Sequence, residues 1–290
     1  MLALLAIVAT VLTIQSPARV QALGADGPRV AYAAGFSSGD CNRVYVWNLL
    51  TRKTVKLGRK THCQQTSTGN RISAVSLAGT RALWLQFQGG NRREYTLWTA
   101  TPTRPAPILI RSIEVDVDDP APIVIGEGDA SRNGDILPYA TGATVTALRA
   151  DGSRALRWEA PARVTALAAT GGELAVGSAD GSVTVLDSRG RLLRSTPGTV
   201  TPSAVAVTGS GVVVQRGRTL EHLSTGRTFL LPAGARLQDA AGPAAAYELR
   251  GVVYRLDLLT GRRTVLARGT YAQLEPGRTI TASGRVVTAR

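Results

Sequence analysis

The feature that most constrains this chain is an internal repeat of short alternating strands, each followed by a turn. Residues 44–52 read VYVWNLLTR and residues 253–261 read VYRLDLLTG, so five of the nine positions are identical. Alternation of apolar and polar residues predicts half-buried strands. A repeated unit of this kind cannot bury its apolar face alone, so neighbouring units must pack against each other.

The same unit recurs between these two copies, and its turn glycines are almost evenly spaced. They fall at 152, 190, 226 and 261, which gives spacings of 38, 36 and 35 residues. In the clearest unit, strands are expected at 164–168, 174–177 and 183–187, with Asp180-Gly181 before the third. Asp-Gly between alternating runs is a strong hairpin signal, because both turn positions tolerate positive φ. Four antiparallel strands in such a period are typical of a β-propeller blade.

Counting the units predicts an all-β, seven-bladed propeller within one domain, residues 23–290. The first unit, residues 29–58, is expected to have three strands and to lack the innermost one. The last unit, residues 270–290, is expected to lack the outermost one. Dividing the length by a blade of about 40 residues also allows six blades, so a six-bladed ring remains the alternative.

These units resemble the WD40-like and quinoprotein-like repeats of bacterial β-propellers over roughly residues 29–290. The nearest equivalents of the Trp-Asp dipeptide are Trp47-Asn48, Leu186-Asp187 and Leu256-Asp257. The chain has no Trp-Asp dipeptide, no Gly-His pair and no tryptophan after its Thr-Gly turns. The resemblance therefore implies the architecture without a cofactor.

The N-terminus reads as a secretory signal peptide. Residues 1–14 are MLALLAIVATVLTI, without a charged side chain, and Pro17 and Arg19 follow. Such a run is too short for an ordinary transmembrane helix, and small residues at 20 and 22 suit a signal peptidase. We expect a signal peptide at residues 1–22 and an extracytoplasmic protein. An uncleaved signal that anchors the chain in the membrane is the alternative.

The chain has two cysteines, Cys41 and Cys63. An even number in an exported protein predicts a disulfide. In a propeller, both cysteines fall on loops at the same end of the ring, where a bridge is geometrically feasible. Two free buried thiols are the alternative.

The net charge of +14 comes almost entirely from arginine and favours anionic partners. The arginines are scattered through nearly every turn, whereas nucleic-acid-binding proteins concentrate them on one face. We therefore expect a monomer that binds a protein or an anionic cell-envelope component, and no nucleic acid. The candidate ligand-face residues lie on the loops at the cysteine-bearing end: Lys60, His62, Arg92 and Arg93.

No catalytic set emerges from the sequence, and no cofactor is expected. The two histidines, His62 and His222, stand far apart, and His222 aligns in the repeat with Asn48 and Asp257, where local hydrogen bonding is expected. A calcium loop is a weaker hypothesis, because oxygen side chains alternate at Asp129, Ser131, Asn133 and Asp135. The acid needed at the twelfth position is replaced by Ala140.

Two functions remain open at this stage. The first is a non-enzymatic binding or scaffold propeller that recognises its partner through one face of the ring. The alternative is a secreted hydrolase or lyase with its site at the central channel. A channel mouth with clustered acids and His or Asn would favour the enzyme, and a channel lined by Ala, Val and Thr would favour the binding protein.

Overall fold

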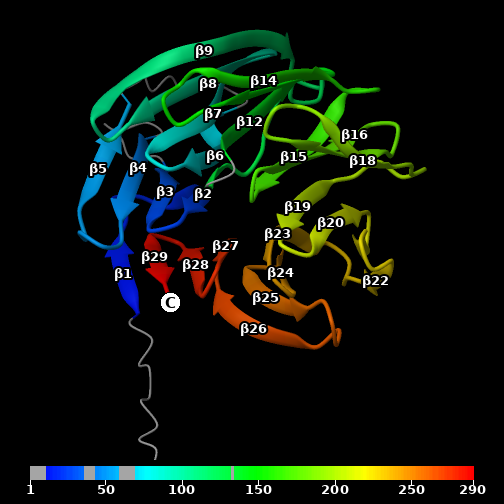
Figure 1. The fold of residues 1–290 in the computed structure, drawn as a ribbon. Helices are drawn as coiled ribbons and strands as arrows, with labels where there is room; N and C mark the ends of the chain where they lie inside the picture. Colours follow the sequence, from blue (N-terminus) through cyan, green and yellow to red (C-terminus); the bar gives the residue numbers. More distant parts are fainter. Residues whose placement is uncertain (1–10, 36–42, 59–68, 132–133) are drawn as a thin grey trace, which may run out of the picture.

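The computed structural model describes residues 11–35, 43–58, 69–131 and 134–290, and all regular structure in these ranges is β. The strands form seven sheets that surround a central channel (Figure 1). Each sheet is an antiparallel meander whose first strand is innermost. No helix in the described ranges is long and apolar enough to cross a membrane. The predicted seven-bladed propeller is confirmed.

The first three blades occupy the N-terminal half of the chain. Blade 1 contains β2 (Val20–Asp26), β3 (Arg29–Ala34), β4 (Arg43–Asn48) and β5 (Thr54–Leu57). Blade 2 contains β6 (Asn70–Ala78), β7 (Arg81–Gly89), β8 (Arg92–Thr101) and β9 (Arg104–Asp116). Blade 3 contains β10 (Ile123–Ile125), β11 (Asp129–Ser131), β12 (Gly134–Thr141), β13 (Thr144–Leu148) and β14 (Arg154–Glu159); β10 and β11 share the innermost place.

The remaining blades follow in chain order. Blade 4 contains β15 (Val164–Thr170), β16 (Glu173–Ser178), β17 (Val183–Asp187) and β18 (Leu192–Thr196). Blade 5 contains β19 (Ala204–Thr208), β20 (Gly211–Arg216), β21 (Thr219–His222) and β22 (Arg227–Leu230). Blade 6 contains β23 (Arg236–Ala241), β24 (Ala244–Leu249), β25 (Val252–Asp257) and β26 (Arg263–Arg268). Blade 7 contains β27 (Tyr271–Glu275), β28 (Arg278–Ser283), β29 (Val286–Ala289) and β1 (Leu12–Gln15).

The expectation that the first and last blades are incomplete is wrong. Blade 7 takes its outermost strand from the N-terminus, because β1 pairs with β29 from Leu12↔Ala289 to Gln15↔Val286 (Figure 1). Blade 1 has its innermost strand in β2, which pairs with β3. The β1 strand lies within the segment expected to be the signal peptide, and β2 crosses the end of that segment. For that reason neither strand was predicted from the sequence. Cleavage after Ala22 remains a prediction, but it would remove β1 and divide β2.

The cores of the ring lie between blades and are built from small aliphatic side chains. One cluster joins blades 1 and 2 through residues such as Val46, Leu57, Ile72 and Leu77, all almost fully buried. The outermost strands are mostly exposed, as the pattern of β18 shows. Burial on both faces explains the nearly continuous apolar runs of the inner strands, and exposure explains the polar outer strands.

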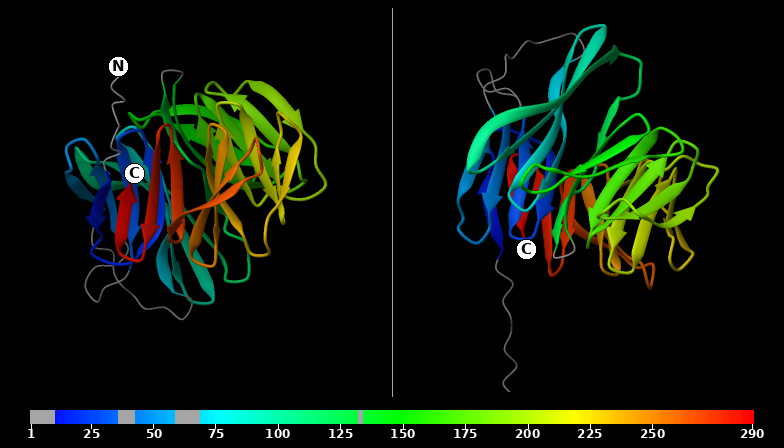
Figure 2. Two further views of the ribbon diagram at one scale, coloured as in Figure 1. Left: turned by 90° about the horizontal axis from the view of Figure 1, so that it is seen from below. Right: turned by 45° about the horizontal axis from the view of Figure 1, so that its top comes forward.

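The ring has two faces that carry different connections. On the hairpin face, the first strand of each blade turns into the second, and in blades 1 to 6 the third turns into the fourth. On the connection face, the second strand turns into the third, and one blade passes to the next. The β8–β9 hairpin is longer than those of the other blades and extends beyond the ring (Figure 2).

Candidate functional site

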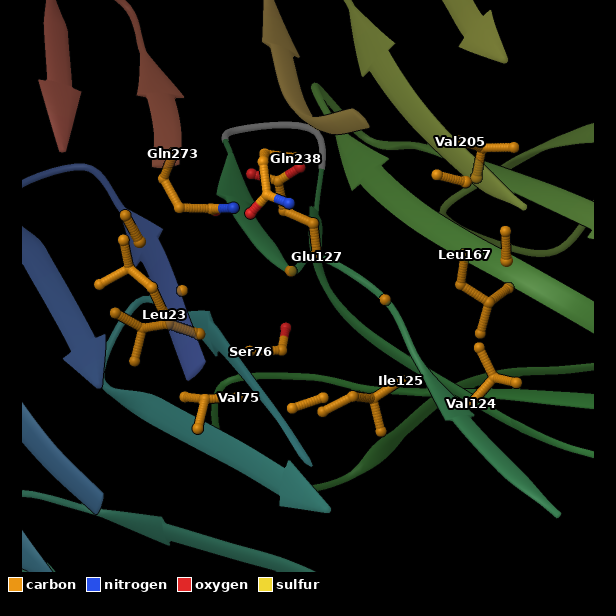
Figure 3. A pocket seen from close by; sticks show the side chains of 18 of the residues that line it. Leu23, Val75, Ser76, Val124, Ile125, Glu127, Leu167, Val205, Gln238 and Gln273 are labelled. Carbon is orange, nitrogen blue, oxygen red and sulfur yellow. The ribbon is translucent and has the colours of Figure 1, made fainter. Parts of the chain in front are cut away.

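The central channel contains a cavity of about 250 Å³ that is lined by the innermost strands of all seven blades. Most of the lining is small or aliphatic, for example Leu23, Val75, Ile125 and Val205. Figure 3 shows these side chains around the cavity, with Glu127, Gln238 and Gln273 gathered at one end and Ser76 directed inward. The cavity is therefore apolar along most of its wall and polar at one end.

Glu127 reaches the channel because glycines on both sides let the backbone pass between neighbouring blades. A Cβ at Gly126 would lie 2.5 Å from the Leu167 Cβ, and one at Gly128 would lie 2.6 Å from the Leu77 carbonyl oxygen. Only glycine fits at such contacts. Here the inner strand of blade 3 breaks, and the amide of Ala169 in blade 4 donates a hydrogen bond to the Glu127 carbonyl at 3.0 Å. Close approach to two blades thus sets the position of the carboxyl group.

Each of four further carboxylates at this end connects one blade to the next by accepting a hydrogen bond from a backbone amide. Asp26 of blade 1 accepts from Gly79 of blade 2, and Asp129 of blade 3 accepts from Gly171 of blade 4 at 2.8 Å. In the same way Asp239 of blade 6 accepts from Leu274 of blade 7 at 2.5 Å, and Glu275 of blade 7 accepts from Gly27 of blade 1. The shared pattern indicates that these acids hold blades together.

Burial of the acids shifts their titration upward. Removal from water raises the pKa of Asp239 to about 6. Removal from water together with the charge of nearby carboxylates raises the pKa of Glu275 to about 7. Burial also raises the pKa of Glu127, and so do the charge of Asp239 and a hydrogen bond between the two side chains. That hydrogen bond lowers the pKa of Asp239, so Glu127 holds the shared proton.

The cavity meets a wider hollow on the hairpin face, and Glu127 and Gly128 line both. The hollow has a volume of about 780 Å³ and is lined by residues of six blades. Charges of both signs surround it: Asp26, Asp129, Glu275, Arg255, Arg278 and Arg290. Among these, Arg278 donates a hydrogen bond to the Gly27 carbonyl at 3.0 Å.

Of the predicted ligand-face residues, the structure describes Arg92 and Arg93. Lys60 and His62 are outside the described residues, as are Cys41 and Cys63, so the ligand loop and the disulfide remain predictions. Arg92 and Arg93 lie on the connection face, opposite the hollow. Arg92 pairs with Glu114 at 3.2 Å, and the Arg93 guanidinium lies 4.7 Å from the centre of the Phe87 ring.

The structure does not bring the two aspartates of the hypothetical calcium loop together. Asp135 pairs in register with Ala130, the neighbour of Asp129, so the two aspartates point to opposite faces of the hairpin. Asp129 accepts from Gly171, whereas Asp135 accepts from Ala150 at 3.3 Å. Asn133 is outside the described residues. In the described ranges, no group of three or more His, Cys, Asp or Glu is arranged to hold a metal ion.

His222 has the local role predicted from the repeat. Asn48 and Asp257 accept backbone amides of the turns that follow them. His222 is buried at the equivalent position, and its Nδ1 lies 2.8 Å from the Thr225 hydroxyl of its own turn. Its Nε2 lies 3.4 Å from the Ser210 hydroxyl, which is too long for an activated nucleophile. This histidine stabilises blade 5.

The acids around the channel were missed by sequence reasoning, except that Asp129 was assigned to a calcium loop. Each comes from a different inner strand or its end, so no local motif joins them. One signal was available: Glu127 stands between two glycines, Gly126 and Gly128, directly after the short apolar run Ile123-Val124-Ile125. Isolated glycines in a strand suggest close backbone approach.

Comparison with known proteins supports the fold alone. No protein-family model matches the chain, and no curated protein matches its sequence. Sqt1 of Saccharomyces cerevisiae is 14% identical, with 96% of this chain and 97% of that chain covered and a TM-score of 0.54. The WD40 β-propeller domain of Doa1 is 13% identical, with coverage of 96% and 94% and a TM-score of 0.58. The chain has the fold of a WD40 β-propeller.

A third similar structure is a chain of the Mitotic Checkpoint Complex. It is 14% identical, covers 96% of this chain and 93% of that chain, and gives a TM-score of 0.57. The Trp-Asp and Gly-His signatures of WD40 repeats are absent from this sequence. The shared feature is therefore the ring of four-stranded blades.

Proposed function

We propose that this propeller is a non-enzymatic binding protein that recognises a protein partner through its hairpin face. The observation that carries the proposal is the hollow of about 780 Å³ at the channel mouth, with acids at its centre and arginines at its rim. Charges of both signs suit a polypeptide with complementary charges. An anionic cell-envelope polymer would meet Asp26, Asp129 and Glu275 there, so a protein partner is favoured.

The acid cluster also relates to the alternative function, a hydrolase or lyase at the channel. Glu127 and Asp239 share a proton, as paired catalytic carboxylates do. However, both oxygens of Asp239 already accept backbone amides, from Ala240 at 2.6 Å and Leu274 at 2.5 Å. A carboxylate held in this way serves the connection between blades, which supports the binding function over the enzyme.

A capture experiment with charge-reversed faces tests the proposal. The double variant Arg255→Glu/Arg290→Glu changes exposed residues that line the hollow, and Arg236→Glu/Arg268→Glu makes the same change on the connection face. We expect a partner captured from cell-envelope extract by the wild type to be lost only with the first variant. Loss only with the second variant would contradict binding through the hairpin face. A captured species that proves to be a polymer would contradict a protein partner.

We also propose that the protein is extracytoplasmic, as the apolar N-terminal segment indicates. Ring closure by β1 supports retention of this strand in the mature protein, which agrees with the uncleaved alternative. Sequencing the N-terminus of the exported protein tests whether β1 is retained. A mature chain that begins at Leu23 would contradict its retention.

A further inference from the structure

The channel cavity has a polar end with buried polar atoms that have no hydrogen-bond partner among the described residues. The Gln273 side chain is only 8% exposed, and its Oε1 has no hydrogen-bond partner among the described residues. The same holds for the hydroxyl of Ser76, which is 1% exposed. Both side chains point into the cavity (Figure 3). Buried polar atoms of this kind are rare and call for a partner.

Two hydroxyl groups of the lining are already engaged elsewhere. The Thr165 hydroxyl donates to the Pro202 carbonyl at 2.8 Å, and the Ser203 hydroxyl donates to the Gln215 carbonyl at 3.2 Å. Glu127 adds a carboxyl group that shares one proton with Asp239, so the pair keeps one negative charge that no Lys or Arg of the described lining neutralises. Although the chain has 34 lysines and arginines, none is among the described residues that line this cavity. A positively charged ligand therefore complements the negative charge of this pair and can donate to the Gln273 and Ser76 oxygens that have no partner.

The rest of the wall determines what kind of cation fits. A metal ion would need several oxygen ligands, whereas Glu127 is the one carboxylate among the described lining residues, and most others are aliphatic. A volume of about 250 Å³ is below the range of roughly 300–1,000 Å³ for pockets of drug-sized ligands. The cavity thus suits a short carbon chain with a cationic end.

We propose that the channel cavity binds a small organic cation. Its ammonium or guanidinium group donates hydrogen bonds to Glu127 and Gln273, and its carbon chain lies against residues such as Val75 and Ile125. The cation enters from the hollow on the hairpin face, because Glu127 lines both spaces. This site does not depend on the protein partner proposed above.

Calorimetric titration with agmatine, which carries a guanidinium and an ammonium group, tests the site. We expect saturable binding to the wild type and none of the neutral analogue 1,4-butanediol. A hydrogen bond from a charged group contributes about 1.5–3 kcal/mol, so Glu127→Met, which removes the acceptor, should weaken binding at least tenfold. Gln273→Met, which keeps the volume and removes the acceptor, should also weaken it. Glu159→Met, at an exposed carboxylate of blade 3, is the matched control and should bind as the wild type does.

Circular dichroism of each variant shows whether the fold is retained. The absence of saturable heat with millimolar agmatine would overturn the proposal, and so would equal binding of 1,4-butanediol. Binding that is lost in Glu275→Gln but unchanged in Gln273→Met would place the cation at the mouth of the hollow and overturn the cavity site.

Discussion

Gly126 packs against Leu167 so closely that there is no room for a side chain at position 126. Gly126→Ala should therefore destabilise the ring by about 1–3 kcal/mol, the usual cost of overpacking. Gly209 is the matched control, because a Cβ there would meet nothing within 4 Å. Gly209→Ala should be neutral or stabilise by up to about 1 kcal/mol. Urea unfolding of both variants measures the difference, and equal stabilities would contradict the proposed packing.

Asp239 is the buried connection between blades 6 and 7, where it accepts two backbone amides. Asp239→Ala leaves two buried donors without partners, so we expect a loss of about 2–4 kcal/mol in the free energy of unfolding.

Asp257 provides the control for this prediction. It also accepts two backbone amides, from Leu259 and Thr260, but in an exposed turn. Water can replace the carboxylate there, so Asp257→Ala should cost less than about 1 kcal/mol. Chemical denaturation of the two variants under the same conditions compares them. A larger loss in Asp257→Ala would refute a dominant role for the buried connection.

At the scale of the element, β1 closes the ring. Besides its pairing with β29, the Ser16 amide donates to the Arg285 carbonyl at 2.6 Å, and Leu12 and Ile14 pack against the core of blades 1 and 7. Deleting residues 1–16 removes the strand and should cost about 3 kcal/mol. That loss lowers the melting temperature by roughly 6–12 °C.

Deletion of residues 1–10 is the control for β1, because it removes none of the described strands. Its melting temperature should equal that of the full chain. If both deletions melt alike, in a calorimetric scan, β1 does not contribute to closure.

The elements that the sequence could predict are those in which local chemistry repeats. Asp187 and Asp257 end their strands before a turn in the same way, and this regularity predicted blades 4 to 6. The β1 strand could not be predicted, because four residues at the end of an apolar run are too few to show the alternation of a strand. Its partner β29 also lies at the other end of the chain. The channel acids were hidden for a related reason: Asp26 and Glu275 come close only after the ring closes.

At the scale of the whole molecule, a strongly basic protein concentrates acids at the centre of one face. Asp26, Asp129 and Asp239 all raise the pKa of Glu275 by their charge, in addition to the larger effect of burial. Because its folded pKa of about 7 lies above the ordinary glutamate value of 4.5, the folded state favours the protonated carboxyl. The resulting stabilisation is complete below the unfolded pKa and is lost as the pH rises through 7.

Glu275→Gln should remove this pH dependence, since glutamine stays neutral and can still accept from Gly27. We expect equal stabilities near pH 5 and a variant more stable than the wild type by about 1–3 kcal/mol at pH 8. Comparing the two proteins cancels the growing repulsion among arginines at low pH, which acts on both. Denaturant unfolding from pH 5 to 8 measures the difference, with Glu159→Gln as the exposed control. A constant difference across this range would mean that Glu275 titrates alike in the folded and unfolded chain, and the acids would then serve only as hydrogen-bond acceptors between blades.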